Sequence, residues 1–258
     1  MNSTEKVLYI LRRLGDPPYE FSGTELANEI GCVKSGVFKI MTDLIAAGFV
    51  SQDPETKKYA LGTGIYRLGC IYREHKGIIG FAEDSVKELA AIVTETVSIG
   101  VMDGKDPIIA FRIESPHGVR LHGKLGTKFP IYAGAVGKLL AAHLDSETIN
   151  NLLKTIVFVK KTNKTIVDSE TLLKEYEKIR QQGYALSEEE NCAGAYGIAA
   201  PIRDSSGKVV ACICVAGPIQ RFTPSKRSEW IPLVIAAADK VSAKLGSGKF
   251  LNKYKEKE

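Results

Sequence analysis

The feature that most constrains the fold is a pair of short helical segments joined by a three-residue turn near the N-terminus. The run SGTE at residues 22–25 has the spacing of a capping box, which starts a helix by satisfying free backbone N–H groups. The turn GCV at residues 31–33 follows that helix, and a second helix of about 34–47 stops at Gly48. Two helices joined by a short turn containing glycine form a helix-turn-helix.

The flanking segments complete a winged version of this unit. Asn2 and Glu5 have a second capping-box spacing, ahead of an amphipathic segment that GDPP at residues 15–18 ends. Beyond the helix pair, residues 49–52 and 58–61 are typical of short strands joined by a polar turn. Three helices followed by a hairpin predict a winged helix-turn-helix. The alternative is a three-helix bundle with a hairpin that binds nothing.

A helix in the DNA major groove reads base edges with its N-terminal residues and contacts phosphates with flanking cations. Candidates for these roles project from the third helix or lie in the wing. Those on the helix point away from its expected buried stripe of Val37, Ile40, Met41, Leu44 and Ile45. The predicted DNA-binding residues are Lys34, Ser35, Phe38, Lys39, Thr42, Lys57 and Lys58. Residues 1–76 hold ten Lys or Arg and nine Asp or Glu, so the placement of the cations matters, not their number. The alternative is that these are ordinary solvated lysines.

The rest of the chain predicts an α+β fold. Apolar residues follow one side of a helix over about 62–79, and strand and helix signals then alternate to about residue 248. We expect a winged helix-turn-helix at 1–62, a linker helix at 63–79, a larger domain at 80–248 and a charged tail at 249–258.

Four stretches together carry a family resemblance. They are GCVKSGVFKIMTDLIAAGFV, KKYALGTGIYRLG, DGKDPIIAFRIESPHGVRLHGKLGTKFPIYAGAVGKLLAA and GYALSEEENCAGAYGIAAPIRDSSGKVVACICVAGPIQR. In this order they resemble the IclR family of transcriptional regulators over nearly the whole chain. The resemblance implies a GAF-like domain that binds a small-molecule effector, a homodimer or homotetramer, and repression or activation set by that effector.

Two positions of the third helix depart from the family pattern. Val33 stands where a serine often begins the recognition helix, and Gly36 where a threonine is usual. Gly36 lacks a hydroxyl and weakens the helix by ~1 kcal/mol relative to alanine. The resemblance therefore predicts DNA binding without predicting the preferred DNA sequence.

A small-residue loop predicts where an effector binds. Gly134, Ala135, Val136 and Gly137 open a helix, where free N–H groups and the helix dipole attract a carboxylate or phosphate. Small side chains let a ligand approach those groups closely, although tight backbone packing would also explain them.

The family resemblance implies further effector-binding positions, all in the last third of the chain. They are Ser187, Ala195, Gly197, Cys214 and Ala216. Cys212 shares a strand face with Cys214 and Ala216 by the period of two. Gly197 stands where the family commonly has a cysteine, and Ala216 where it often has a hydroxyl. We therefore expect a less polar pocket that takes a bulkier organic acid, including an aromatic one.

Other chemistry finds little support. The acidic run at residues 187–191 is expected to be a solvated loop, because runs of charge usually face water. The four histidines have no metal-ligand spacing, the five cysteines form no CxxC pair, and HExxH, P-loop and GxSxG motifs are absent. We expect no metal, no cofactor and no enzymatic activity, since no nucleophile lies beside a base in any recognisable motif.

The interpretation that these observations favour is a transcriptional regulator that binds double-stranded DNA at a palindromic or near-palindromic operator. The alternative is a redox sensor on the same DNA-binding module, switching through Cys212 or Cys214, although their apolar flanks argue against it. No apolar run approaches the ~20 residues that span a bilayer, and the N-terminus lacks a signal-peptide core, so we expect a cytoplasmic protein without a membrane partner.

Overall fold

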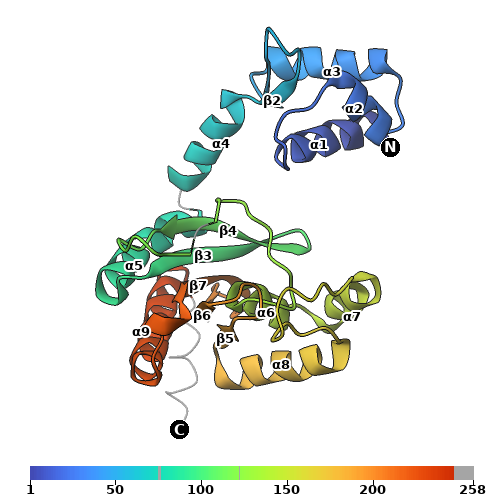
Figure 1. Ribbon diagram of the computed structural model, residues 1–258. Helices are drawn as coiled ribbons and strands as arrows, with labels where there is room; N and C mark the ends of the chain where they lie inside the picture. The colour runs from blue at the N-terminus through green and yellow to red at the C-terminus, as the bar shows by residue number, and fades with distance from the viewer. Residues whose placement is uncertain (75–76, 122, 247–258) are drawn as a thin grey trace. The chain divides into compact units, whose positions relative to one another are not determined.

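Figure 1 shows the computed structural model of the protein, which describes residues 1–74, 77–121 and 123–246. The chain divides into two compact units, Met1–Gly77 and Ile78–Glu258. The expected α+β fold class is confirmed by helices and sheets in both units. The linker helix groups with the first unit, and the division at 62, 79 and 248 stays a prediction. The charged tail predicted at 249–258 lies outside the described residues.

The first unit is a winged helix-turn-helix. Its elements are α1 (Ser3–Leu14), α2 (Gly23–Glu29), α3 (Lys34–Ala46), β1 (Val50–Gln52), β2 (Tyr59–Leu61) and α4 (Thr63–Glu74). Both predicted capping boxes form, with the side chains of Asn2 and Ser22 accepting from backbone N–H groups three residues on. The two wing strands pair antiparallel, and Phe21 adds a bridge to Tyr59.

The core of this unit is made by apolar residues of all three helices and the wing. It includes Ile10, Leu14, Phe21, Leu26, Val37, Met41, Leu44, Val50 and Tyr59. Ile45 was expected in the buried stripe of α3, but it is 40% exposed. Leu44 occupies the core-facing position of that turn, and the next residue is rotated by about 100° around the helix. The expectation for Ile45 was therefore wrong.

The second unit contains a five-stranded antiparallel sheet in the order β4-β3-β7-β6-β5. Its strands are β3 (Thr96–Asp103), β4 (Asp106–Ile113), β5 (Ala185–Glu188), β6 (Ala195–Arg203) and β7 (Val209–Pro218). Its helices are α5 (Ile78–Val93), α6 (Ala135–Ala142), α7 (Ser146–Thr155), α8 (Ser169–Gln182), α9 (Pro224–Lys244) and the short 3-10 helix η1 (Ile219–Arg221). The sequence reasoning did not predict α7 or β5.

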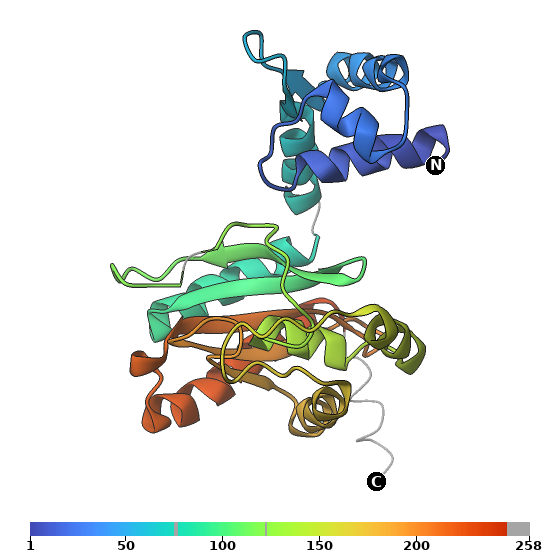
Figure 2. The same cartoon turned by 45° about the vertical axis from the view of Figure 1, so that its right-hand side comes forward.

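Helices cover both faces of this sheet (Figures 1 and 2). Helices α5 and α9 pack on one face, against alternate strand residues such as Val97, Ile198 and Val215. Helices α6 and α8 lie on the other face, over residues such as Ala199 and Cys214. Because successive strand residues point to opposite faces, one strand serves both cores. The second face is the one on which the effector residues were predicted.

Candidate functional site

The predicted DNA-binding side chains all lie on the surface of the first unit. Lys34, Ser35, Phe38, Lys39 and Thr42 are exposed along α3, and Lys57 and Lys58 are exposed in the wing. Phe38 is 67% exposed, unusual for an aromatic side chain on a helix that packs its opposite side into a core. The Thr42 hydroxyl donates to the Phe38 carbonyl oxygen at 3.0 Å, which leaves it only acceptor capacity toward a base. α3 therefore offers one continuous polar surface with an exposed ring.

The wing tip has a defined shape. The Asp53 carboxylate accepts hydrogen bonds from the backbone N–H groups of Glu55 and Thr56 at 2.9 and 2.6 Å. Hydrogen bonds from Thr56 are the main reason that the pKa of Asp53 is lowered. Lys57 has a φ of 59°, and its carbonyl oxygen accepts from the Gln52 amide at 3.0 Å. The turn thus presents Lys57 and Lys58 on an ordered loop.

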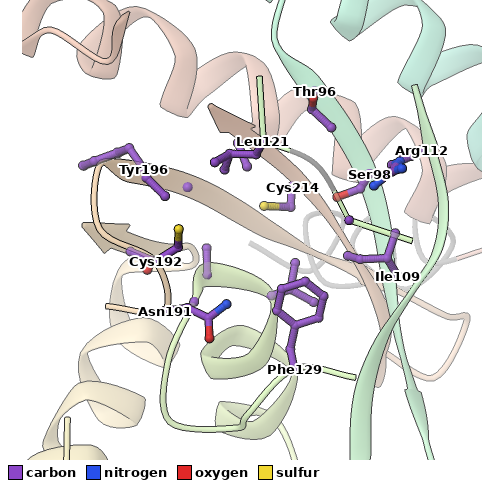
Figure 3. Close-up of a pocket in the computed structure, with 18 of the residues that line it drawn as sticks. Thr96, Ser98, Ile109, Arg112, Leu121, Phe129, Asn191, Cys192, Tyr196 and Cys214 are labelled. Carbon is purple, nitrogen blue, oxygen red and sulfur yellow. The ribbon is translucent and has the colours of Figure 1, made fainter. Parts of the chain in front are cut away.

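The second unit contains a partly open cavity of about 200 Å³ on the α6 side of its sheet (Figure 3). We call it the effector cavity. Its lining residues are Thr96, Ser98, Ile109, Arg112, Leu121, Gly123, Lys124, Phe129, Gly134, Ala135, Val136, Ser187, Glu190, Asn191, Cys192, Ala195, Tyr196, Gly197, Cys214 and Ala216. The structure thus brings together all the predicted effector residues except Gly137 and Cys212.

Strand register explains how distant residues meet in this cavity. Ser187 of β5 lies opposite Gly197, which lies opposite Ala216, which lies opposite Thr96. The adjacent row on the same face contains Cys214 and Ser98. The floor of the cavity is therefore a patch of small and hydroxyl-bearing side chains drawn from four strands.

Gly137 and Cys212 lie outside the cavity for different packing reasons. A Cβ on Gly137 would collide with the Pro130 carbonyl oxygen, so tight backbone packing explains that glycine. Cys212 shares the strand face of Cys214 but pairs with Gly100, one step farther along the sheet. There it is fully buried near Val136.

The N-terminus of α6 already has an internal carboxylate. The Gly134 N–H donates to Glu190 Oε2 at 3.2 Å, and Glu190 Oε1 accepts from Lys138 Nζ at 2.6 Å. Lys138 is fully buried and also donates to Glu175 at 2.6 Å. Two expectations are therefore corrected, because the Gly134 N–H is not free for a ligand and Glu190 is not part of a solvated loop.

Sequence reasoning missed Glu190 and the cavity's cationic side chains. Arg112 is 15% exposed and donates to Glu114 Oε1 at 2.8 Å, and Lys124 also lines the cavity. The signal for Arg112 was its position between Phe111 and Ile113, because successive residues of a strand point to opposite faces of the sheet. The signal for Glu190 was Lys138, a lysine inside an otherwise apolar helix that requires an anionic partner.

The two cysteines of β7 are poor candidates for a redox switch. Burial raises the pKa of Cys214 to about 12 and raises that of Cys212 well above its ordinary value. A thiol with a raised pKa is rarely the reactive thiolate. Cys192, by contrast, is exposed at the cavity.

Two features are absent from the described part of the chain. Over residues 1–74, 77–121 and 123–246, no group of three His, Cys, Asp or Glu side chains is arranged to hold a metal ion. Within the same residues, no helix has the length and apolar character needed to cross a membrane.

An exposed helix-turn-helix with a lysine-bearing wing, joined in one chain to a domain with a ligand-sized cavity, defines a ligand-binding DNA regulator. Residues 70–243 match the family described as Bacterial transcriptional regulator IclR C-terminal. The chain is 30% identical over 246 residues to the HTH-type transcriptional regulator KdgR of Escherichia coli K12, covering 95% of this chain and 93% of the relative. The chain therefore belongs to the IclR family of transcriptional regulators.

Solved structures agree with this fold. A putative IclR regulator from Silicibacter sp. TM1040 superposes with a TM-score of 0.88 at 22% identity, covering 95% of this chain and 96% of that one. An IclR homologue from Microbacterium hydrocarbonoxydans, solved with 4-hydroxybenzoate, has a TM-score of 0.78 at 18% identity, covering 95% of this chain and all of the other. Both agree with the α+β fold predicted from the sequence.

Proposed function

We propose that this regulator changes its affinity for operator DNA when a small organic acid occupies the effector cavity. The observation that carries the proposal is the charge of the described lining. Arg112 and Lys124 are cationic, and the carboxylate of Glu190 is already paired with Lys138. A partly enclosed site whose wall carries two cationic side chains, and whose lining carboxylate is already paired, favours an anion, because a lower dielectric strengthens the attraction.

The walls of the cavity favour an acid with an apolar body. Phe129, Ile109 and Val136 line it alongside the small residues of the sheet. The relative solved with 4-hydroxybenzoate shares this fold, which supports an organic acid of similar size as the ligand class. An aromatic ring fits such walls, because flat apolar surfaces stack favourably.

On the DNA side, we propose that α3 enters the major groove and that the wing lysines contact the neighbouring backbone. We propose a homodimer or homotetramer on a palindromic or near-palindromic duplex, since pairing two weak modules raises affinity through effective concentration. The exposed apolar residues Leu68 and Ile71, which lie on one side of α4, support this because they offer a surface on which copies can pair. The cytoplasm is where we expect this protein to act.

An effector can shift DNA binding only if it binds the DNA-competent and DNA-incompetent arrangements with different affinity. A tenfold change in operator affinity requires ~1.4 kcal/mol of such coupling. This is within the range of one charge-assisted hydrogen bond gained or lost at the cavity.

The test uses a duplex selected by the full chain from a random library, measured by fluorescence anisotropy at constant salt. We expect at least one small organic acid to change operator affinity while leaving binding to a scrambled duplex unaltered. Selection that yields no preferred sequence would contradict the DNA-reading role. A selected operator whose affinity no organic acid changes would contradict the effector role.

A further inference from the structure

Helix α3 carries a second apolar row, on its exposed side. Phe38 is 67% exposed, Ile45 is 40% exposed, and Thr42 between them is exposed as well. These residues stand at positions i, i+4 and i+7, which places them in one row along the helix. We call this row, Phe38, Thr42 and Ile45, the outer stripe. It is separate from the residues of α3 that are buried in the core of the unit.

The hydrogen bond of Thr42 adds a methyl group to the outer stripe. The Thr42 hydroxyl donates to the Phe38 carbonyl oxygen at 3.0 Å, so its proton is held against the helix backbone. The γ-methyl group occupies a different staggered position on the same Cβ. Because residues four apart are neighbours on a helix surface, this methyl group lies beside the Phe38 ring. The first half of the outer stripe is therefore an aromatic ring next to a methyl group.

The rest of α3 lacks the side chains that read adenine. All residues of this helix lie in the described part of the chain, and their sequence, KSGVFKIMTDLIA, contains no Arg, Asn or Gln. Lysine suits guanine or phosphate, and aspartate suits cytosine, whereas adenine is read by paired hydrogen bonds from Asn or Gln. Without Asn or Gln, the distinctive group of an A·T pair that α3 can contact is the 5-methyl group of thymine, which is read by apolar contact.

Cations lie on both sides of the outer stripe. Lys34 and Lys39 are exposed, and the helical rotation of about 100° per residue places them on opposite sides of the row. In a major groove, such flanking cations contact phosphates while the side chains between them face the base edges. This charge pattern favours duplex DNA, rather than an apolar protein surface, as the partner of the outer stripe.

We propose that the Phe38 ring and the Thr42 methyl group read the 5-methyl group of thymine in the operator. This inference rests on the proposed function, because it requires α3 to enter the major groove. It deepens that function by naming the base that the helix selects. Each half-site then contains thymine at the one or two positions that face the outer stripe.

The experiment compares thymine with uracil in the operator that the full chain selects from a random library. Deoxyuridine pairs with adenine as thymidine does and lacks only the 5-methyl group. The thymines of one half-site are replaced one at a time, and affinity is measured by fluorescence anisotropy. In wild type, we expect uracil to lower affinity about fourfold at one or two positions, or ~0.8 kcal/mol, as for one buried carbon. Uracil tolerated at every position, or selected half-sites without thymine, would overturn the proposal.

Variants assign the contact to the outer stripe. Phe38→Ala should lower affinity for the thymine operator about tenfold and remove the uracil penalty at the thymine that the ring contacts, since the methyl group has lost its partner. Thr42→Ser deletes a methyl group, keeps the hydroxyl, and should reduce the penalty. Leu8→Ala is the matched control, because Leu8 is 54% exposed on α1, outside α3, and should keep the full penalty.

Measurements at low salt keep the weaker variants within range, because phosphate contacts strengthen there. A uracil penalty in Phe38→Ala equal to that of wild type would overturn the proposal, since DNA shape or another side chain would then detect the methyl group. An unchanged penalty in Thr42→Ser would remove Thr42 from the reading surface.

Lys39→Ala separates this inference from the proposed function. If the chain selects a preferred duplex that Lys39→Ala binds more weakly, but uracil is tolerated at every position, the reading of thymine alone is wrong. If the chain selects no preferred sequence, the DNA-reading role itself fails. A uracil penalty that persists in Lys39→Ala and is lost in Phe38→Ala would support both.

Discussion

Replacing Lys138 with methionine should destabilise the effector-binding unit more than any single change at its surface. Lys138 is fully buried, and its Nζ lies 2.6 Å from both Glu175 and Glu190. The two carboxylates are 20% and 13% exposed, so water screens them only partly. Methionine keeps the length of the side chain and removes its charge, which leaves two negative groups facing an apolar atom.

The size of the effect follows from this geometry. Removing one partner of a buried ion pair costs ~3–5 kcal/mol, because the remaining charge stays desolvated. The partial exposure of both carboxylates argues for the lower end, ~3 kcal/mol. Adding Glu190→Gln to Lys138→Met removes one of the two uncompensated charges, so the double variant should be more stable than Lys138→Met alone by ~1 kcal/mol or more.

Urea unfolding of the full chain, followed by tryptophan fluorescence, measures this directly. Trp230 is the single tryptophan of the sequence and is 4% exposed in the core of the effector-binding unit, so its signal reports on that unit. Lys174→Met is the matched control, since Lys174 is 74% exposed and pairs with an exposed Glu170 on α8. We expect that control to cost less than ~0.5 kcal/mol. A loss below ~1 kcal/mol for Lys138→Met, or a double variant less stable than the single, would refute the argument.

Three further predictions concern DNA, thiols and pH. Lys39→Ala should lower operator affinity by ~1–3 kcal/mol if Lys39 reads a base, whereas Lys58→Ala should weaken binding to all duplexes alike and lower the salt slope by ~1. Anisotropy titrations at several salt concentrations check both, with Lys174→Ala as the control. Unchanged DNA binding in both variants would contradict the prediction. A thiol reagent added to the native protein should react in a fast phase that Cys192→Ser removes, while the two buried cysteines of β7 react only on unfolding. Fast labelling of the β7 cysteines would instead support a redox role. Burial lowers the pKa of His143 in the folded state, so the unfolded chain takes up its proton first and stability should fall as pH drops through ~6.5, by at most ~1.4 kcal/mol per pH unit. His143→Gln should flatten that slope in urea titrations across pH, and an unaltered slope would contradict the assignment.

The winged helix could be predicted because its signals are local. Each capping box involves residues three positions apart, and the helix-turn-helix and hairpin together fit within the first 62 residues. No contact between distant segments was needed to recognise them. The same reasoning missed β5, whose four residues are too short to show a period of two with confidence against a loop. It missed α7 although Asp145 caps it, because the preceding apolar helix α6 dominated the pattern.

The small-residue part of the effector cavity was also within reach, because a period of two put Cys214 and Ala216 on one strand face. The residues that give the cavity its charge could not be predicted in this way. The sequence does not distinguish a charged side chain that faces water from one that has an internal partner. Glu190 lies 56 residues from Gly134, whose N–H donates to its carboxylate. Only the register of five strands and the position of α6 bring those groups together.

A helix N-terminus with small residues predicts an anion site, and the structure does place a carboxylate there, but that carboxylate belongs to the chain itself. Because Lys138 neutralises Glu190 from inside the core, this end of the cavity needs no further negative charge. The cationic side chains of the cavity lining, Arg112 and Lys124, come from β4 and from the segment that follows it. Charge pairing within the core, which no local pattern reports, determines whether the N–H group at the start of α6 is open to a ligand's acid group.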